Sequence, residues 1–168
     1  MTSNAQTLMR RVRCLLVLFT VGLVLSGLTA FPLKIEVDIL NGLFGQGSSF
    51  EAFWPEMARW ISRVHAGISE VHQKHLFISY GTDWLAFAHI VIAIGFLGAI
   101  RDPVRNIWVV EFAMIACVLV VPFSLIVGGF REIPMFWRLI DCSFGVVGIV
   151  PLWLARRYTR RLILDAAA

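Results

Sequence analysis

Residues 106–130 read NIWVVEFAMIACVLVVPFSLIVGGF, and Glu111 is the only charged residue among them. A helix rises about 1.5 Å per residue, so about 20 apolar residues cross the hydrocarbon core of a bilayer, which is about 30 Å thick. This stretch is longer than that. It therefore predicts a transmembrane helix, and it indicates the class of protein to which the rest of the sequence belongs.

The overall composition agrees with a membrane protein. Of the 168 residues, 58% are hydrophobic and 15% are charged, whereas soluble domains average roughly 45–50% and about 25%. The mean hydropathy is +0.78. These values exclude an intrinsically disordered chain, a nucleic-acid-binding module and most small cytosolic enzymes, so we expect no nucleic-acid partner.

Three further apolar stretches have the length of a membrane span, and they cover residues 14–31, 81–100 and 136–155. Residues 101–105 predict a tight turn between two spans, because Pro103 disfavours the helical conformation at the residue before it. The predicted fold is an all-α integral membrane protein. It consists of a four-helix transmembrane bundle with one extracytoplasmic amphipathic interfacial helix.

Basic residues indicate the orientation of such a bundle, since Lys and Arg collect in cytoplasmic segments. The segments 1–13, 101–105 and 156–168 together carry nine arginines. The segments 32–80 and 131–135, which lie on the other side, carry fewer basic residues and also most of the carboxylates. We predict that both termini are cytoplasmic and that the membrane is the cytoplasmic (inner) membrane of a bacterium.

A cleaved signal peptide is an alternative explanation for residues 14–31. The apolar run is long, however, and Leu28 stands where a small residue is needed before cleavage after Ala30, so retention of the segment is favoured. The three cysteines all lie inside predicted spans, and the sequence has no CxxC motif. This pattern predicts neither a disulfide framework nor a cysteine metal site.

The segment 32–80 is the largest part outside the predicted spans. Residues 34–40 alternate apolar and polar side chains, which is compatible with a strand but too short to establish one. Residues 42–49 are rich in Gly and Ser and predict a loop.

An amphipathic helix is predicted after this loop, over about residues 50–76. Ser48 and Glu51 match a capping box, and Pro55 suits the first turn of a helix. Projection at 100° per residue separates an apolar face from a charged one. We expect this helix to lie in the outer membrane interface.

Three histidines, His65, His72 and His75, fall on one side of that predicted helix. Imidazoles gathered in this way can bind a divalent metal. Their spacing lacks the i, i+4 pair of strong helical metal motifs, so a solvated interfacial face is the favoured interpretation. Haem is disfavoured because no other predicted span offers a second deep histidine, and no cofactor is predicted.

Two ionisable residues lie deeper in the predicted spans. His89, near the bilayer centre, should face the bundle, where it serves either as a packing hydrogen bond to a neighbouring helix or as a proton relay or ligand contact. Glu111 lies near the cytoplasmic end of its span, and we expect a static role in which its carboxylate either extends to the membrane interface or pairs with Arg101 or Arg105. Proton or ion movement that uses His89 and Glu111 is the third functional hypothesis.

Charged residues near the outer ends of the spans form the best candidate site. The candidates are Asp83, Arg138, Asp141 and, deeper, His89. They either line one outward-facing pocket or form salt bridges that hold the bundle together. Arg138 and Asp141 can pair at a spacing of three residues, and Gly145 and Gly148 continue their stripe as a predicted helix-packing surface.

The sequence favours a role that is not enzymatic, because no nucleophile–base arrangement, HExxH motif or phosphate-binding glycine motif is present. The leading hypothesis is a structural or accessory membrane protein that acts through protein or lipid partners, other membrane proteins or a second copy of itself. The alternative is an outward-facing binding or catalytic site for a polar ligand or lipid headgroup, centred on Asp83, His89, Arg138 and Asp141.

Overall fold

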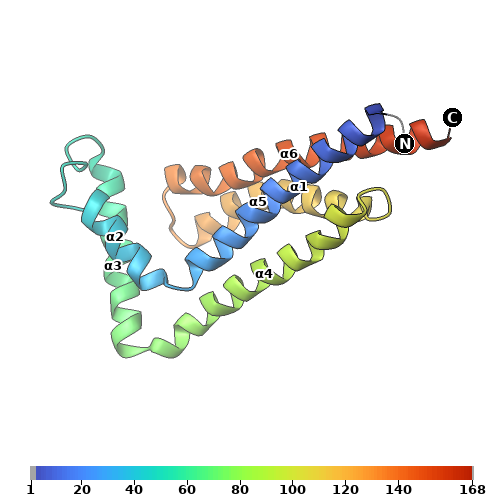
Figure 1. Ribbon diagram of the computed structural model, residues 1–168. Coiled ribbons are helices and arrows are strands. Elements are labelled where there is room, and N and C mark those ends of the chain that lie inside the picture. Colours follow the sequence, from blue (N-terminus) through green and yellow to red (C-terminus); the bar gives the residue numbers. More distant parts are fainter. Residues whose placement is uncertain (1–2, 168) are drawn as a thin grey trace. The chain divides into compact units, whose positions relative to one another are not determined.

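The computed structural model describes residues 3–167. The protein is all-helical, with 86% of the chain in helices, and the described residues contain no strand. The elements are α1 (Ser3–Ala30), α2 (Leu33–Phe44), α3 (Pro55–Lys74), the short 3-10 helix η1 (Leu76–Ser79), α4 (Tyr80–Arg101), α5 (Ile107–Phe130) and α6 (Met135–Ala167) (Figure 1).

Four of these helices, α1, α4, α5 and α6, are long and apolar enough to cross a membrane. The shortest, α4, has 22 residues, and is therefore about 33 Å long. Only 22–28% of the residues in the apolar window of each helix are buried inside the protein. The remaining apolar side chains face outward, and lipid solvates such a surface far better than water does.

The chain folds as two compact units. Unit 1 comprises Met1–Leu23 and Ile92–Ala168, and unit 2 comprises Val24–Val91. The division falls within α1 and within α4, so each of these two helices contributes residues to both units.

Unit 1 has a core to which α1, α4, α5 and α6 all contribute. Val12, Phe96, Val110 and Leu152, one from each helix, are almost completely buried. The rings of Phe19 and Phe96 pack with their centroids 5.1 Å apart. Within unit 1, the four membrane-length helices therefore share a single hydrophobic core.

Helices α5 and α6 lie antiparallel and side by side in this unit (Figure 1). A methyl group added at Gly145 would lie 2.3 Å from the carbonyl oxygen of Cys117 and 2.6 Å from the side chain of Val120. A methyl group at Gly148 would lie 3.2 Å from the Cys117 sulfur. These contacts confirm the predicted packing stripe, because only glycine allows the two backbones to approach this closely.

A short turn, residues 102–106, connects α4 to α5 and contains the buried Pro103. The carboxylate of Asp102 accepts a hydrogen bond of 3.0 Å from the backbone N–H of Arg105. The guanidinium of Arg13 donates two hydrogen bonds, of 3.1 and 3.0 Å, to carbonyl oxygens in the last turn of α4. These bonds satisfy carbonyl groups that a helix end leaves without partners.

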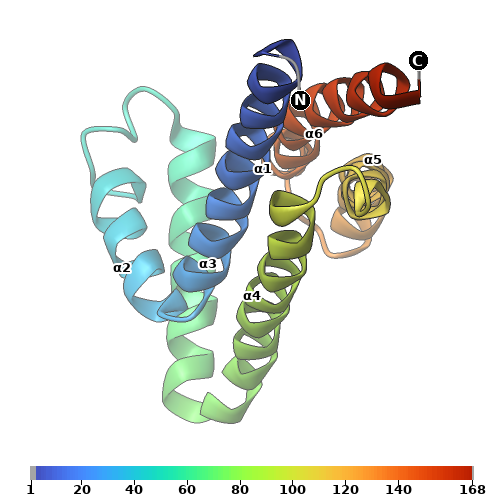
Figure 2. The same ribbon diagram turned by 45° about the vertical axis from the view of Figure 1, so that its right-hand side comes forward.

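In unit 2, α2 packs against α3 (Figure 2). Ala58 and Ile61 of α3 are buried. The short strand considered for residues 34–40 is wrong, since these residues belong to α2. Alternation over so few residues does not distinguish a strand from a helix, whereas the ion pair between Lys34 and Asp38 joins residues one helical turn apart.

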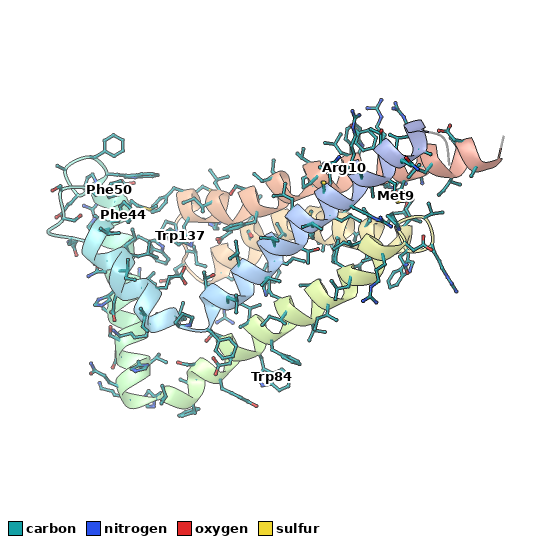
Figure 3. The ribbon with its side chains drawn as sticks, viewed as in Figure 1. Met9, Arg10, Phe44, Phe50, Trp84 and Trp137 are labelled. Carbon is teal, nitrogen blue, oxygen red and sulfur yellow. The ribbon has the colours of Figure 1, made fainter. Side chains whose placement is uncertain are left out.

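Helix α3 begins at Pro55, which occupies its first turn as predicted. The capping box proposed for Ser48 and Glu51 is not formed, because both side chains bond to backbone groups within the preceding loop, each at 2.7 Å. The ring of Phe44, at the end of α2, packs edge-on against Phe50 of this loop with centroids 5.2 Å apart (Figure 3). The loop is therefore closed by its own contacts, and the helix starts after it.

The contact at Gly145 makes a direct prediction about stability. Gly145→Ala should lower the unfolding temperature of the purified protein in detergent by several degrees, because the added methyl group meets backbone; overpacking of this kind costs about 1–3 kcal/mol. Gly95→Ala in α4 is the matched control, since a methyl group there meets nothing within 4 Å. Equal unfolding temperatures for the two variants would contradict the close α5–α6 contact.

Candidate functional site

The candidate residues from the sequence divide between the two units. Asp83 and His89 lie on α4 in unit 2, whereas Arg138 and Asp141 lie on α6 in unit 1. The two pairs therefore have different neighbours, and Asp83 lies beside an open groove.

Asp83 lines a groove of about 700 Å³ in unit 2. The groove is bounded by the turn after α1, the start of α2, α3, η1 and the start of α4, and its exposed lining is mostly apolar. The polar lining residues are Lys34, His72, Ser79, Tyr80, Thr82 and Asp83. Its volume lies within the range of small-molecule sites, roughly 300–1,000 Å³.

A smaller and largely open hollow of about 260 Å³, the slot, is lined by Phe31, Tyr80, Asp83, Trp84 and Phe87. Three of these residues also line the groove, so the two cavities adjoin. The aromatic rings follow α4 one turn at a time, with Tyr80 and Trp84 centroids 6.0 Å apart and Trp84 and Phe87 centroids 5.7 Å apart. Trp84 points away from the axis of α4 (Figure 3).

Lys34 is held beside the groove by an ion pair. Its ammonium nitrogen lies 2.6 Å from one carboxylate oxygen of Asp38, and Nε2 of His65 lies 2.8 Å from the other. The hydrogen bond from Lys34, with a smaller contribution from His65, lowers the pKa of Asp38 below its ordinary value of 3.8. The sequence analysis did not identify this cluster because residues 34–40 were not assigned to a helix, although the four-residue Lys–Asp spacing was a visible signal.

Two other polar groups of the groove, Asp83 and His72, have no partner within the part of the chain that the structure describes. Asp83 is half-buried and His72 is exposed. Among the described residues, neither side chain forms a hydrogen bond or an ion pair. The groove therefore presents a carboxylate and an imidazole that are available to a ligand.

The three histidines considered as metal ligands have separate surroundings. Within residues 3–167 there is no group of three or more His, Cys, Asp or Glu side chains that could hold a metal ion. His65 is bonded to Asp38, and the ring of His75 packs edge-on against Phe77 with centroids 6.1 Å apart. His72 lines the groove.

His89 forms its hydrogen bond within its own helix. Nδ1 lies 2.8 Å from the carbonyl oxygen of Leu85, so Nδ1 donates the proton. Helix α1 passes close by, because a methyl group at Gly27 would lie 3.0 Å from the carbonyl oxygen of Ala86 and from Cβ of His89. The expected hydrogen bond to a neighbouring helix is therefore replaced, at Nδ1, by one to the preceding turn of α4.

In unit 1, Arg138 bonds to the end of α5. Its Nη1 donates to the carbonyl oxygen of Leu125 at 3.1 Å, and its side chain lies over Gly128, where a methyl group would be 2.7 Å from Cγ and Cδ. The expected ion pair with Asp141 is absent among the described residues. The guanidinium instead interacts with the negative end of a helix dipole.

Glu111 pairs with α6. Its Oε1 lies 2.7 Å from Nε of Arg156 and 3.4 Å from Nη2 of Arg160. The expected partners, Arg101 and Arg105, were wrong, because the antiparallel packing of α5 and α6 brings together residues that are 45 positions apart.

No family model matches this sequence, and no curated protein or solved structure matches it either. The class of protein is therefore defined by the fold and its contacts. It is a small all-helical protein with four membrane-length helices and an amphipathic groove in unit 2.

The ion pair between Glu111 and Arg156 should couple α5 to α6 energetically. Glu111→Gln and Arg156→Gln should each destabilise the protein in detergent. The double variant should lose little more than either single variant, with a coupling energy of about 1 kcal/mol for a partly exposed pair.

A matched control is the more exposed pair Glu70–Lys74 on α3. Glu70→Gln should change the unfolding temperature very little. Strictly additive effects of the Glu111 and Arg156 substitutions would contradict the structural role of this pair.

Proposed function

We propose that the chain is a small integral membrane protein of structural or accessory type that acts through protein or lipid partners. The observation that carries this proposal is the outward-facing apolar surface of the four long helices. In the apolar window of each helix, at most 28% of the residues are buried within the protein. The contacts of Glu111 and Arg138 support it, because both side chains are engaged in joining helices.

The proposed topology places α1, α4, α5 and α6 across the bacterial cytoplasmic membrane, with both termini in the cytoplasm. The nine arginines of segments 1–13, 101–105 and 156–168 support this orientation. Helix α3 then lies on the outer side as an amphipathic interfacial helix.

Cysteine labelling tests the orientation. In a background in which the three native cysteines are replaced by serine, Gln73→Cys should react with a membrane-impermeant maleimide in intact cells. Asp165→Cys should react only after permeabilisation. Both positions are exposed on the protein surface. Reaction of the position-165 cysteine in intact cells would contradict the proposed topology.

A stripe of bulky side chains on α5 offers the test of the partner hypothesis. The stripe consists of Phe112, Ile115, Leu119, Phe123 and Ile126, which are 53–63% exposed. A photo-cross-linking residue at Leu119 should give a discrete protein adduct in native membranes, whereas the same residue at the buried Val110 should not. Adducts with lipid alone at every position of the stripe would contradict an accessory role through this helix.

The groove favours a second candidate function, an outward-facing binding site. Of the residues proposed for such a site from the sequence, Asp83 lines the groove. His72, which was considered only as a metal ligand, and Lys34, which was not considered, contribute the other ionisable groups. This arrangement is suited to binding rather than to a covalent reaction, since its charged groups surround a mostly apolar space.

A further inference from the structure

The two adjoining cavities of unit 2 differ in the polarity of their linings. The groove carries the ionisable side chains of Lys34, His72 and Asp83. The slot extends it along α4 past Trp84 to Phe87, and its exposed surface is almost entirely apolar. A molecule that fills both cavities therefore meets ionisable groups in the groove and an almost entirely apolar surface in the slot.

The charges of the groove have both signs. Lys34 is cationic, Asp83 is an anionic carboxylate without an internal partner among the described residues, and His72 can donate a hydrogen bond. A purely anionic headgroup would leave Asp83 facing a like charge. Lys34 already forms an ion pair with Asp38, which engages two of its three N–H donors. A headgroup that carries both a phosphate and a primary ammonium gives Asp83 a counter-charge, and it offers an acceptor to His72 and to the remaining N–H donor of Lys34.

We propose that unit 2 binds one phospholipid molecule whose headgroup carries a phosphate and a primary ammonium group. Lys34 and His72 bind the phosphate, Asp83 binds the ammonium, and one acyl chain occupies the slot between Phe31, Trp84 and Phe87. The proposal rests on the proposed membrane location, which places the start of α4 at an interface where lipid headgroups and chains meet. It deepens the second candidate function by naming the class of ligand.

The exposed side chains around the groove favour a lipid over a soluble ligand. Phe77 is 76% exposed, Tyr80 is 62% exposed and Trp84 is 56% exposed. Aromatic side chains of this kind are typical of membrane interfaces, where one part contacts chains and another contacts headgroups. A soluble ligand confined to the groove would leave the apolar slot unfilled.

Native mass spectrometry of the full-length protein in detergent tests the headgroup assignment. The probes are phosphatidylethanolamine, phosphatidylglycerol and phosphatidylcholine with identical acyl chains. One molecule of phosphatidylethanolamine should bind about tenfold more tightly than the other two, as expected for one charge-assisted hydrogen bond. Asp83→Asn should abolish this preference, and Asp83→Glu, which keeps the carboxylate, should retain it.

The matched control for charge is Glu70→Gln, on the exposed face of α3 and outside the groove. It should leave the preference unchanged. Lys34→Gln should weaken the binding of all three lipids alike, because all three carry the phosphate. Equal binding of the three lipids to the wild-type protein, or an unchanged preference in Asp83→Asn, would overturn the headgroup assignment.

Two further measurements test the acyl-chain assignment. Phe87→Ala should weaken phosphatidylethanolamine binding several-fold, whereas Phe123→Ala, which removes a phenylalanine of similar exposure on α5, should not. Soluble glycerophosphoethanolamine should compete poorly, because it lacks acyl chains. Equal competition by this headgroup analogue, or equal effects of the two phenylalanine substitutions, would overturn the use of the slot.

Failure of this proposal is distinguishable from failure of the proposed function. Circular dichroism and size-exclusion chromatography show whether each variant is folded, and bound lipid is counted whatever the orientation of the protein. A wrong topology would change the cysteine labelling, while a wrong lipid assignment would change only the bound mass.

Discussion

The close approach of α5 and α6 at Gly145 is the contact on which unit 1 depends. Because no side chain separates Gly145 from the Cys117 carbonyl, the two helices pack backbone to backbone. This register also brings Glu111 to Arg156 at one end of the pair and Arg138 to the Leu125 carbonyl at the other. Three contacts of different chemistry therefore define one antiparallel arrangement.

Two polar contacts of unit 1 lie at the end of α4 and in the turn that follows it. Arg13 donates to the last carbonyls of α4, and Asp102 accepts a backbone hydrogen bond in the turn that follows. Such contacts satisfy groups that a helix end leaves unpaired. In the proposed membrane this distribution has a further advantage, since hydrocarbon supplies no hydrogen-bond partners and favours apolar contacts in the middle of each span.

Unit 2 gives a physical reason for the apolar composition of the segment between α1 and α4. Apolar residues that would be unfavourable in a loop exposed to water form α2. This helix packs on α3 and contributes Leu33, Lys34 and Ile35 to the groove. The Asp38 carboxylate, bonded to both Lys34 and His65, connects the same two helices. The resulting surface is mostly apolar and carries charges of both signs. Such a surface suits the proposed contact with phospholipid better than contact with bulk water.

The sequence by itself determined the four membrane-length helices, the turn at Pro103, the first turn of α3 at Pro55 and the packing role of Gly145. Each of these follows from local length, composition or spacing along one helix. Only the tertiary structure decided the partner of Glu111, the capping role of Arg138 and the assembly of Lys34, His72 and Asp83 around one groove. These features join residues that are far apart in the chain. They depend on which helix faces pack together, and the pattern of residues along a single helix does not determine that.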